Sequence, residues 1–586
     1  MGLDAYLTLA VLVAMVAALV TGRVSPPAGI LGATALLYVA GVVTAAEAFM
    51  GFANPAPITV AGLYVIAGAI ERTGAIQPLV GRLLREPTTD GRDLARLVVP
   101  SAAASSFLAN TPIVAMLTPA VTQWADRHGR SASTFLIPLS YATILGGAVT
   151  VIGTSTNLVV SGLLEQSGRE PLALFELSRI GLPLAVVGLI PIIVLAPKLL
   201  PTRRRPREVA RGRDFTLSMV VDALGPIAGQ SVRDAGLRNL SGVFLVEIVR
   251  PGRTIAPVQP SQTLRAGDRL VFAGQVDNVV DLHRMPGLSP TEAGVTDILS
   301  NGNGDQAFFE VVIGASSPLA GRTAAEMDFR GRYQAAVLAV HRSGERIRDK
   351  LGIVRLRPGD TLLLVAGKDF AVRWRDAGDF LLVSRLDAAP PAAGRQAPFA
   401  AAALAAVVAL PLLGVLSVTR ATIFAALGLI LVGVLRPRDA RDAIDPNVVL
   451  MIGGAFGLGE AVRVSGLADV IAGGILDGFG WAGTAGAIVG LIVATMILTE
   501  LITNAAAVAL VFPIALGVAI DTGLDVRLLM IGIAVAGSAS FLTPIGYQTN
   551  TMVYGPGGYR FTDYLRLGVP LSLLTITGVT TLVLLG

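Results

Sequence analysis

The sequence contains no cysteine and little charge. The absence of cysteine excludes disulfide bonds and thiolate chemistry in all 586 residues. Charged residues make up 15% of the chain and hydrophobic residues 53%, whereas ordinary soluble domains hold about 25% charged residues. The histidines, His128, His283 and His341, are scattered and form no metal-binding group. The composition therefore indicates a protein that crosses a lipid bilayer many times.

The charge is concentrated in the middle of the chain. Residues 1–200 and 396–586 carry few charges, whereas residues 202–386 contain most of the arginine, aspartate and glutamate. The net charge of +5 does not indicate a nucleic-acid partner, because no interleaved aromatic and basic pattern accompanies it. The basic run Arg203–Arg207 directly follows an apolar stretch, and the positive-inside rule places it and the following segment in the cytosol.

Apolar stretches predict membrane-spanning helices on both sides of this segment. A span needs about 20 apolar residues. The first stretch, Tyr6–Val20, lacks the basic start and the cleavage site of a signal peptide, so we expect a retained helix. The predicted helical segments are 5–21, 27–44, 56–72, 93–124 (interrupted), 134–164 (interrupted) and 177–199, then 397–416, 420–436, 446–476, 483–519 (interrupted), 525–556 (interrupted) and 564–585.

Asparagine motifs recur at matching places in the two apolar halves. Asn110 precedes Asn157 by 47 residues, and Asn504 precedes Asn550 by 46 residues. Asn157 and Asn550 both close the pattern Gly-x-x-Thr-Asn. Small polar residues can serve only for close helix packing, but that does not account for asparagines at matched spacing. Interrupted apolar segments at equivalent places in two halves indicate the binding site of a transporter.

The polar insert contains a different repeat. Each copy is predicted to form a small α/β unit of roughly 70–80 residues, in which a turn leads tightly into a strand. The matching segments are Pro226–Arg233, Val243–Val249 and Arg265–Asp268 in the first copy, and Pro318–Ala324, Gln334–His341 and Arg357–Asp360 in the second. Neither copy has the Gly-x-Gly-x-x-Gly fingerprint, so we expect no NAD. The predicted domains are 1–202, 203–295, 296–392 and 393–586.

These motifs resemble two known families. The insert copies, with their Pro-x-x-Gly and Arg-x-Gly-Asp landmarks, resemble RCK-C (TrkA-C) domains. The apolar halves resemble the divalent anion:sodium symporter family of the ion transporter superfamily, which carries Ser-Asn-Thr at the tip of a helical hairpin in each half. Here Ala109, Thr503 and Ala505 depart from that signature, while both asparagines are kept.

The resemblance implies a fold and a location. The fold is a polytopic α-helical membrane protein with inverted repeats, each containing a re-entrant helical hairpin, and with two small cytosolic α/β RCK-C-like domains inserted between the halves. The family implies a homodimer in the inner or plasma membrane, in which a transport domain moves against a fixed scaffold. The insert is expected to act as a regulatory or dimerisation module, or else as a structural clamp. Related domains bind cyclic di-AMP, which makes such a nucleotide a candidate ligand.

The four asparagine motifs contain no Arg, Lys or His, although arginine is the usual partner of a strongly held anion. Bound cations and helix dipoles would then offset the anion's charge, which explains how sodium coupling could arise. We therefore predict an anion site at Asn110, Thr111, Asn157, Asn504 and Thr549. The resemblance also implies that Ser105 and Thr499 stand at positions that help to coordinate sodium in the family. One sodium site is predicted at Ser105, Asn110 and Gly153, and another at Thr499, Asn504 and Thr543. No transition metal is expected.

The predicted function is sodium-coupled symport of a small divalent anion, with sulfate slightly favoured over a dicarboxylate. Glu500 leaves an alternative open, because an acid within a membrane segment is by default a functional hypothesis. It could carry protons in a sodium/proton antiporter or another permease of the superfamily, or it could have a structural role. A membrane sensor of anion concentration is a further alternative. A potassium channel is disfavoured, because no Thr-Val-Gly-Tyr-Gly-like filter occurs. An enzyme is not expected.

Overall fold

The chain packs into two compact units, Met1–Thr202 with Pro390–Gly586, and Arg203–Ala389. The predicted basic run Arg203–Arg207 and His283 lie outside the described residues. The computed structural model describes residues 2–21, 24–75, 83–84, 86–202, 216–223, 225–237, 243–250, 253–255, 258–274, 287–290, 306–314, 317–342, 345–347, 353–367, 369–374, 379–385, 394–479 and 482–586.

Helices form nearly all of the first half of the larger unit. Asn54 shows how their ends are set: its side chain accepts a hydrogen bond from the Ala56 N–H (2.9 Å), which caps a helix with proline at its first position. The elements are α1 (Leu3–Val20), α2 (Pro26–Val39), α3 (Ala45–Phe49), η1 (Met50–Ala53), α4 (Pro55–Thr73), α6 (Asp90–Ser105), α7 (Asn110–Arg127), η2 (Ala132–Thr134), α8 (Leu136–Gly147), α9 (Ser155–Gln166) and α10 (Ser178–Leu199).

The second half repeats this plan. The prediction of one continuous helix over 446–476 is wrong, because Gly466 adopts a left-handed conformation (φ +74°) that ends one helix before the next begins. The elements are α15 (Ala397–Leu412), α16 (Val418–Leu431), α17 (Pro437–Ala443), α18 (Pro446–Val464), α19 (Leu467–Phe479), α20 (Gly483–Leu501), α21 (Asn504–Thr522), α22 (Val526–Ser538), α23 (Gln548–Tyr554) and α24 (Phe561–Leu585).

Six helical segments of the described chain are long and apolar enough to cross a membrane. Several shorter apolar helices, including α2, α16 and α22, accompany them. This pattern is consistent with the predicted polytopic membrane protein. The six segments are Ala45–Thr73, Ser178–Leu199, Pro446–Val464, Gly483–Leu501, Asn504–Thr522 and Phe561–Leu585.

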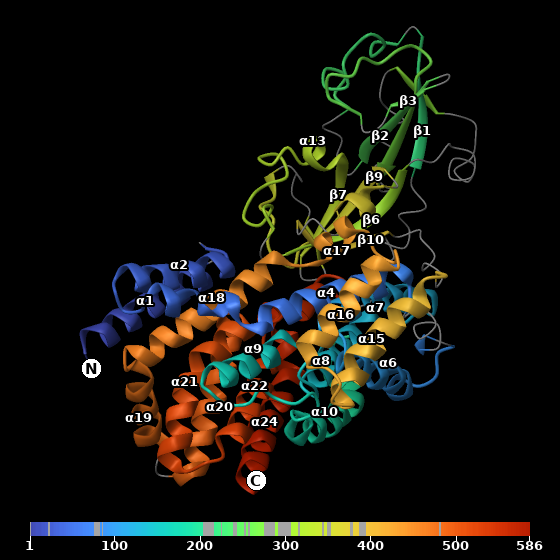
Figure 1. The fold of residues 1–586 in the computed structure, drawn as a ribbon. Coiled ribbons are helices and arrows are strands. Elements are labelled where there is room, and N and C mark those ends of the chain that lie inside the picture. Colours follow the sequence, from blue (N-terminus) through green and yellow to red (C-terminus); the bar gives the residue numbers. More distant parts are fainter. Residues whose placement is uncertain are drawn as a thin grey trace. The chain divides into compact units, whose positions relative to one another are not determined.

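The two halves interlock within the larger unit. Figure 1 shows α1 and α2, in blue, beside α18, in orange, and these helices pack against one another. Each half contains a helix pair, α6–α7 or α20–α21, and a broken helix, α8–α9 or α22–α23. Within each half the pair contacts the broken helix, α6 against α8 and α20 against α22. Across the halves α7 contacts α23, and α21 contacts α9. Gly146 permits the close approach of α8 to α6, because a methyl group there would overlap the backbone of Ala102.

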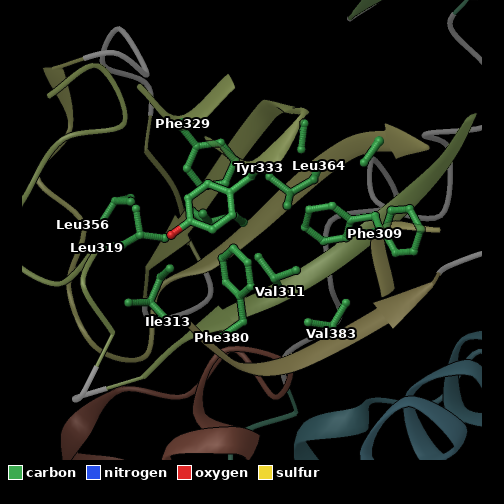
Figure 2. Close-up of a cluster of buried hydrophobic side chains, with 14 of the residues drawn as sticks. Phe309, Val311, Ile313, Leu319, Phe329, Tyr333, Leu356, Leu364, Phe380 and Val383 are labelled. Atoms are coloured by element: carbon green, nitrogen blue, oxygen red, sulfur yellow. The ribbon is translucent and has the colours of Figure 1, made fainter. Parts of the chain in front are cut away.

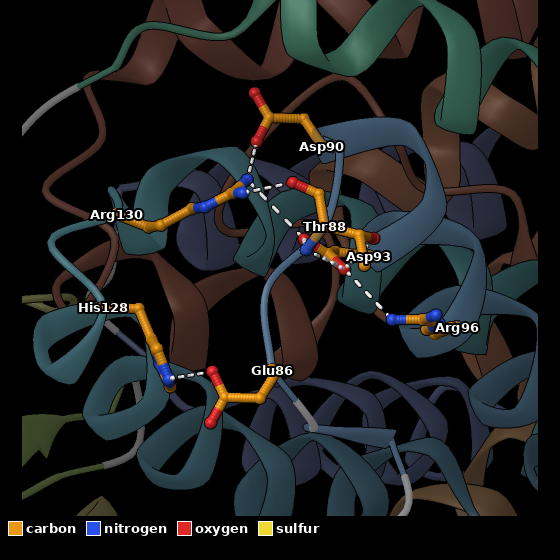
Figure 3. Close-up of polar contacts among 7 residues, drawn as sticks. All are labelled: Glu86, Thr88, Asp90, Asp93, Arg96, His128 and Arg130. Carbon is orange, nitrogen blue, oxygen red and sulfur yellow. Dashed lines mark hydrogen bonds and ion pairs between the residues drawn. The ribbon is translucent and has the colours of Figure 1, made fainter.

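An ionic cluster joins the two outer ends of the α6–α7 pair (Figure 3). Arg130, just beyond α7, pairs with Asp90 at the start of α6 and donates to the Thr88 carbonyl at 2.6 Å. Asp93 is buried and accepts hydrogen bonds from both the N–H (2.9 Å) and the hydroxyl (2.8 Å) of Thr88. These contacts fix the end of the pair that lies away from its tip.

The smaller unit contains two sheets of the same topology. Their strand orders are β3-β2-β4-β1-β5 and β8-β7-β9-β6-β10, with antiparallel pairing throughout. The strands are β1 (Thr216–Val221), β2 (Val243–Arg250), β3 (Arg253–Ile255), β4 (Arg269–Gly274), β5 (Leu288–Pro290), β6 (Gln306–Ile313), β7 (Ala335–Arg342), β8 (Glu345–Arg346), β9 (Thr361–Gly367) and β10 (Phe380–Arg385), with short helices α13 (Phe329–Tyr333) and α14 (Phe370–Trp374).

One ion pair recurs in both sheets at the predicted Arg-x-Gly-Asp turns. Asp268 accepts two hydrogen bonds from Arg250, and Asp360 accepts two from Arg342, all at 2.7 to 2.8 Å. Each aspartate also accepts the N–H of the arginine that opens its turn. Figure 2 shows the apolar core of the second sheet, in which aromatic rings including Tyr333 gather over the strands.

Candidate functional site

The tips of the two helix pairs carry the same hydrogen bond. We call residues 105–110 the first tip and residues 499–504 the second tip. At the first tip, Ser105 donates its hydroxyl to Asn110 Oδ1, five residues further on. At the second tip, Thr499 Oγ1 lies 2.8 Å from Asn504 Oδ1, also five residues further on, and 2.6 Å from the Gly537 carbonyl. All four side chains are buried. The hydroxyl residue therefore orients the asparagine that opens the second helix of each pair.

The broken helices are held by the same asparagine contacts in both halves. The first break spans residues 148–154 and the second 539–547. Asn157 donates from Nδ2 to the carbonyls of Gly147 (2.9 Å) and Thr150 (2.8 Å). Asn550 donates to carbonyls ten and seven residues before it, at 2.9 and 3.1 Å. Because a carbonyl can only accept, these contacts turn the amide oxygen of each asparagine away from the break.

The two amide oxygens then differ in their surroundings. Asn550 Oδ1 accepts the hydroxyl of Ser140 at 2.7 Å. Asn157 Oδ1 is buried and has no hydrogen-bond partner among the described residues. An unpaired buried acceptor costs free energy unless a ligand satisfies it. Asn157 Oδ1 is therefore a free acceptor beside the first break.

The first tip is bonded across the molecule to the second break. Asn110 Nδ2 donates to the hydroxyl of Tyr547 at 2.9 Å. The hydroxyl of Thr111 donates to Gln548 Oε1 at 3.2 Å. Thr154, which corresponds to Tyr547 in the first half, has a shorter side chain, and its Oγ1 lies 3.3 Å from Ser538 Oγ at the end of α22. The first tip thus receives two long side chains from the other half.

Glu500 lies beside the second break and accepts hydrogen bonds from it. The Leu542 N–H donates to one carboxylate oxygen at 2.7 Å, and the Thr543 hydroxyl donates to the other at 2.6 Å. Gly546 leaves room for this arrangement, since a methyl group there would overlap both Glu500 Oε2 and the Ser540 hydroxyl. In the first half the corresponding position is Ser106, whose carbonyl accepts the hydroxyl of Thr150. The second half thus has a side-chain carboxylate as acceptor where the first half has a backbone carbonyl.

Most of the predicted site residues lie in these tips and breaks. Ser105, Asn110 and Thr111 lie at or directly beside the first tip, and Thr499 and Asn504 at the second. Gly153 packs directly on the backbone of Gly147. The Thr543 hydroxyl donates to Glu500, and Thr549 Oγ1 lies 2.8 Å from Ser140 Oγ. No hydrogen bond in the described part of the chain joins Asn110 to Asn504; each tip bonds elsewhere.

Sequence reasoning missed three side chains that contact these motifs. Tyr547 and Gln548 stand inside the Gly-x-x-Thr-Asn motif, so the motif itself was the signal that could have identified them. Ser140 lies in α8 without a motif, and it was not predictable because its partners belong to the other half. Among the described residues, no three His, Cys, Asp or Glu side chains are grouped to hold a metal ion.

Comparison with known sequences identifies the family to which the chain belongs. Residues 15–535 match the citrate transporter family, CitMHS. The chain belongs to this family. The protein is therefore a transporter and not an enzyme, and the family and the apolar helices together indicate a membrane protein.

Relatives of the chain fall into two groups. It is 35% identical over 568 residues to a putative sulfur deprivation response regulator of Chlamydomonas reinhardtii, covering 94% of this chain and 97% of that protein. It is 33% identical over 575 residues to an uncharacterized transporter of Synechocystis sp., covering 94% and 92%. A sodium/sulfate cotransporter of Chlamydomonas reinhardtii, cotransporter 2, is 30% identical over 344 residues, which is 55% of this chain and 38% of that protein.

Proposed function

We propose that the protein is a secondary active transporter that couples sodium entry to symport of a small divalent anion, with sulfate favoured over a dicarboxylate. The observation that carries the proposal is the repeated Ser/Thr–Asn pair at the two tips, Ser105–Asn110 and Thr499–Asn504. Neither tip contains a basic side chain. The similarity to sodium/sulfate cotransporters supports both the cation and the anion.

The polar atoms of the first tip and those beside the first break suit two ligands of opposite charge. Asn110 Oδ1, the Ser105 hydroxyl and the unpaired Asn157 Oδ1 are oxygen atoms, as sodium requires, and Gly153 would contribute backbone oxygen. We assign a second sodium ion to Thr499, Asn504 and Thr543. The anion is assigned to Asn110, Thr111, Asn504 and Thr549, whose amides and hydroxyls can donate hydrogen bonds. Asn157 was also predicted for the anion, but the Gly147 and Thr150 carbonyls accept both of its amide hydrogens, so its free oxygen suits the sodium ion instead.

The transport cycle that we propose is elevator-type alternating access. In this scheme α6–α7 and α20–α21 are re-entrant hairpins that move together with the bound ligands. This scheme requires their unpaired backbone groups to line a polar cavity, because such groups are tolerated inside the membrane only there or where protein covers them. We assign the protein to the inner or plasma membrane as a homodimer in the bilayer. The two sheet domains would be cytosolic RCK-C regulatory or dimerisation modules, spanning 203–295 and 296–392, with cyclic di-AMP as a candidate ligand.

Specific observations support two other functions. Glu500 is a carboxylate within an apolar helix, which an antiporter could use to carry protons. The relative described as a putative sulfur deprivation response regulator is similar over nearly its whole length, which supports a sensor of anion concentration. A sensor would bind the anion without sustained transport, and an antiporter would move protons without an anion.

Uptake into proteoliposomes tests the proposal. Labelled sulfate and labelled succinate are offered separately, with and without an inward sodium gradient. We expect sodium-driven uptake of sulfate, and loss of uptake in Asn110→Ala and in Asn504→Ala at unchanged folding. Asn447→Ala is the matched control, since this asparagine is exposed at the start of α18. Sodium-driven proton movement without uptake of either anion would refute the proposal.

A further inference from the structure

The first tip and the second break form a polar cluster whose members are Asn110, Thr111, Tyr547 and Gln548. Asn110 and Thr111 begin α7, Tyr547 ends the second break and Gln548 begins α23. The two residues of each hydrogen-bonded pair are 437 positions apart in the sequence. The cluster is partly accessible, because Thr111 and Tyr547 are half-buried and Gln548 is exposed. Asn110 is the buried member. A small ligand could therefore reach the cluster.

Three oxygen atoms of the cluster already accept a hydrogen bond from a neighbouring side chain. Asn110 Oδ1 accepts from Ser105, the Tyr547 oxygen accepts from Asn110, and Gln548 Oε1 accepts from Thr111. The hydrogen atoms that stay without an acceptor among the described residues are those of the Tyr547 hydroxyl and of Gln548 Nε2, together with the second hydrogen of Asn110 Nδ2. The open side of the cluster thus presents donors and no carboxylate.

This imbalance matches a compact oxyanion. An anion such as sulfate accepts hydrogen bonds through every oxygen and donates none, so it complements a surface of free donors. The first half has no equivalent, because Thr154 and Ser155 occupy the positions corresponding to Tyr547 and Gln548 and are too short to offer the same reach. The second tip offers one unpaired donor, the buried Asn504 Nδ2, but it also contains the carboxylate of Glu500, which the first tip lacks.

We infer that Tyr547 and Gln548 are specificity-determining residues that donate hydrogen bonds to the transported anion at the first tip. The inference rests on the proposed function and adds the substrate contacts that the second half supplies. The internal bonds also explain how these donors are positioned, since Asn110 holds the Tyr547 oxygen and Thr111 holds Gln548 Oε1. The anion site is then complete only when α7 and the second break are in contact.

The test measures sulfate uptake as a function of sulfate concentration in proteoliposomes. Tyr547→Phe keeps the ring and removes one donor together with the acceptor of Asn110 Nδ2. Gln548→Leu has a similar size and removes the other donor together with the acceptor of the Thr111 hydroxyl. A hydrogen bond to a charged group contributes strongly to the binding free energy, so its loss in each variant should raise the KM for sulfate about tenfold or more. The maximal rate and the sodium dependence at saturating sulfate should stay close to wild type, which separates a lost substrate contact from general damage.

Tyr554→Phe is the matched control, because it removes a tyrosine hydroxyl from the opposite end of α23 and should leave the KM unchanged. Gln548→Glu, which places a negative charge against the anion, should nearly abolish uptake. Sulfate-dependent thermal stabilisation in sodium-containing detergent gives a second readout of binding.

The possible outcomes are distinguishable. Wild-type KM in both Tyr547→Phe and Gln548→Leu would overturn the inference and leave the proposed function standing. Absence of uptake and of stabilisation by any divalent anion in the wild type would overturn both. If Tyr547→Phe does not yield folded protein, the exposed Gln548 decides the question, since its substitution disturbs no packing.

Discussion

Asn157 donates its side-chain amide to the Gly147 carbonyl at 2.9 Å, across the full length of the first break. Asn550 makes the same bond to Ser540 at the same distance in the second half. A break in a helix leaves carbonyls without their usual partners. The asparagine replaces the missing donors, so each break keeps one defined shape.

Asn157→Asp should destabilise the protein strongly. The carboxylate would face the carbonyl oxygens of Gly147 and Thr150, leaving two buried acceptors unpaired and adding a charge, at a cost of about 3 kcal/mol or more. Thermal unfolding in detergent measures the effect. Asn447→Asp is the control: it adds the same charge at an exposed helix start, where a negative charge is favourable. Equal melting temperatures in the two variants would contradict the bridging role.

Glu500→Gln distinguishes a structural acceptor from a proton carrier. Glutamine keeps one oxygen but turns an NH2 group toward either the Leu542 N–H or the Thr543 hydroxyl, so we expect a loss of about 1–3 kcal/mol in stability. Melting temperature and sodium-driven uptake are measured together. Full sodium-driven uptake in the variant would argue against proton transport by Glu500. Unchanged stability would contradict its role in holding the second break.

Glu176 and Arg527 link the loop before α10 to the start of α22, and their contribution should depend on pH. Partial burial acts to raise the pKa of Glu176, but the hydrogen bonds from Arg527 and the Ala173 N–H outweigh it and hold that pKa below 4.5. A carboxylate with a lowered pKa stabilises the fold when ionised, and this contribution is lost as the pH falls through the lowered pKa.

The melting temperature of Glu176→Gln should therefore be lower than that of wild type by a constant amount from pH 8 down to about pH 5. The difference should shrink as the pH falls below about 4.5. Arg527 also donates to the carbonyls of Glu170 and Pro171, so the variant should still fold. A difference that grows toward acid pH would contradict the assignment.

Asp360→Asn should loosen the second sheet locally. Asp360 is 1% exposed and its charge is paired with Arg342, so removing the charge should cost about 3 kcal/mol. Hydrogen exchange of β7 and β9 in the full chain measures the change. Asp369→Asn removes an exposed charge paired with Arg373 and should cost under about 1 kcal/mol. Equal protection in the two variants would show that the buried pair contributes nothing.

The helices and the asparagine motifs were predictable because their signals are local. Long apolar runs identified the spans, and the spacing of Asn110, Asn157, Asn504 and Asn550 identified the tips and breaks. Two smaller features were missed because the apolar runs around them hide the local signal. Gly466 divides α18 from α19 within an apolar run, and the first break begins before Gly153, where the predicted interruption was placed.

The sequence by itself determined where the helices run, where they break and which polar residues stand at the breaks, since these properties depend on neighbours within a few positions. Only the tertiary structure decided which polar atoms are paired and which are free. The Asn110–Tyr547 bond joins residues 437 positions apart, and Glu500 meets Thr543 only because α20 packs against α22. Hydrogen-bond pairing depends on distances between folded segments, and the amino-acid sequence alone does not give those distances.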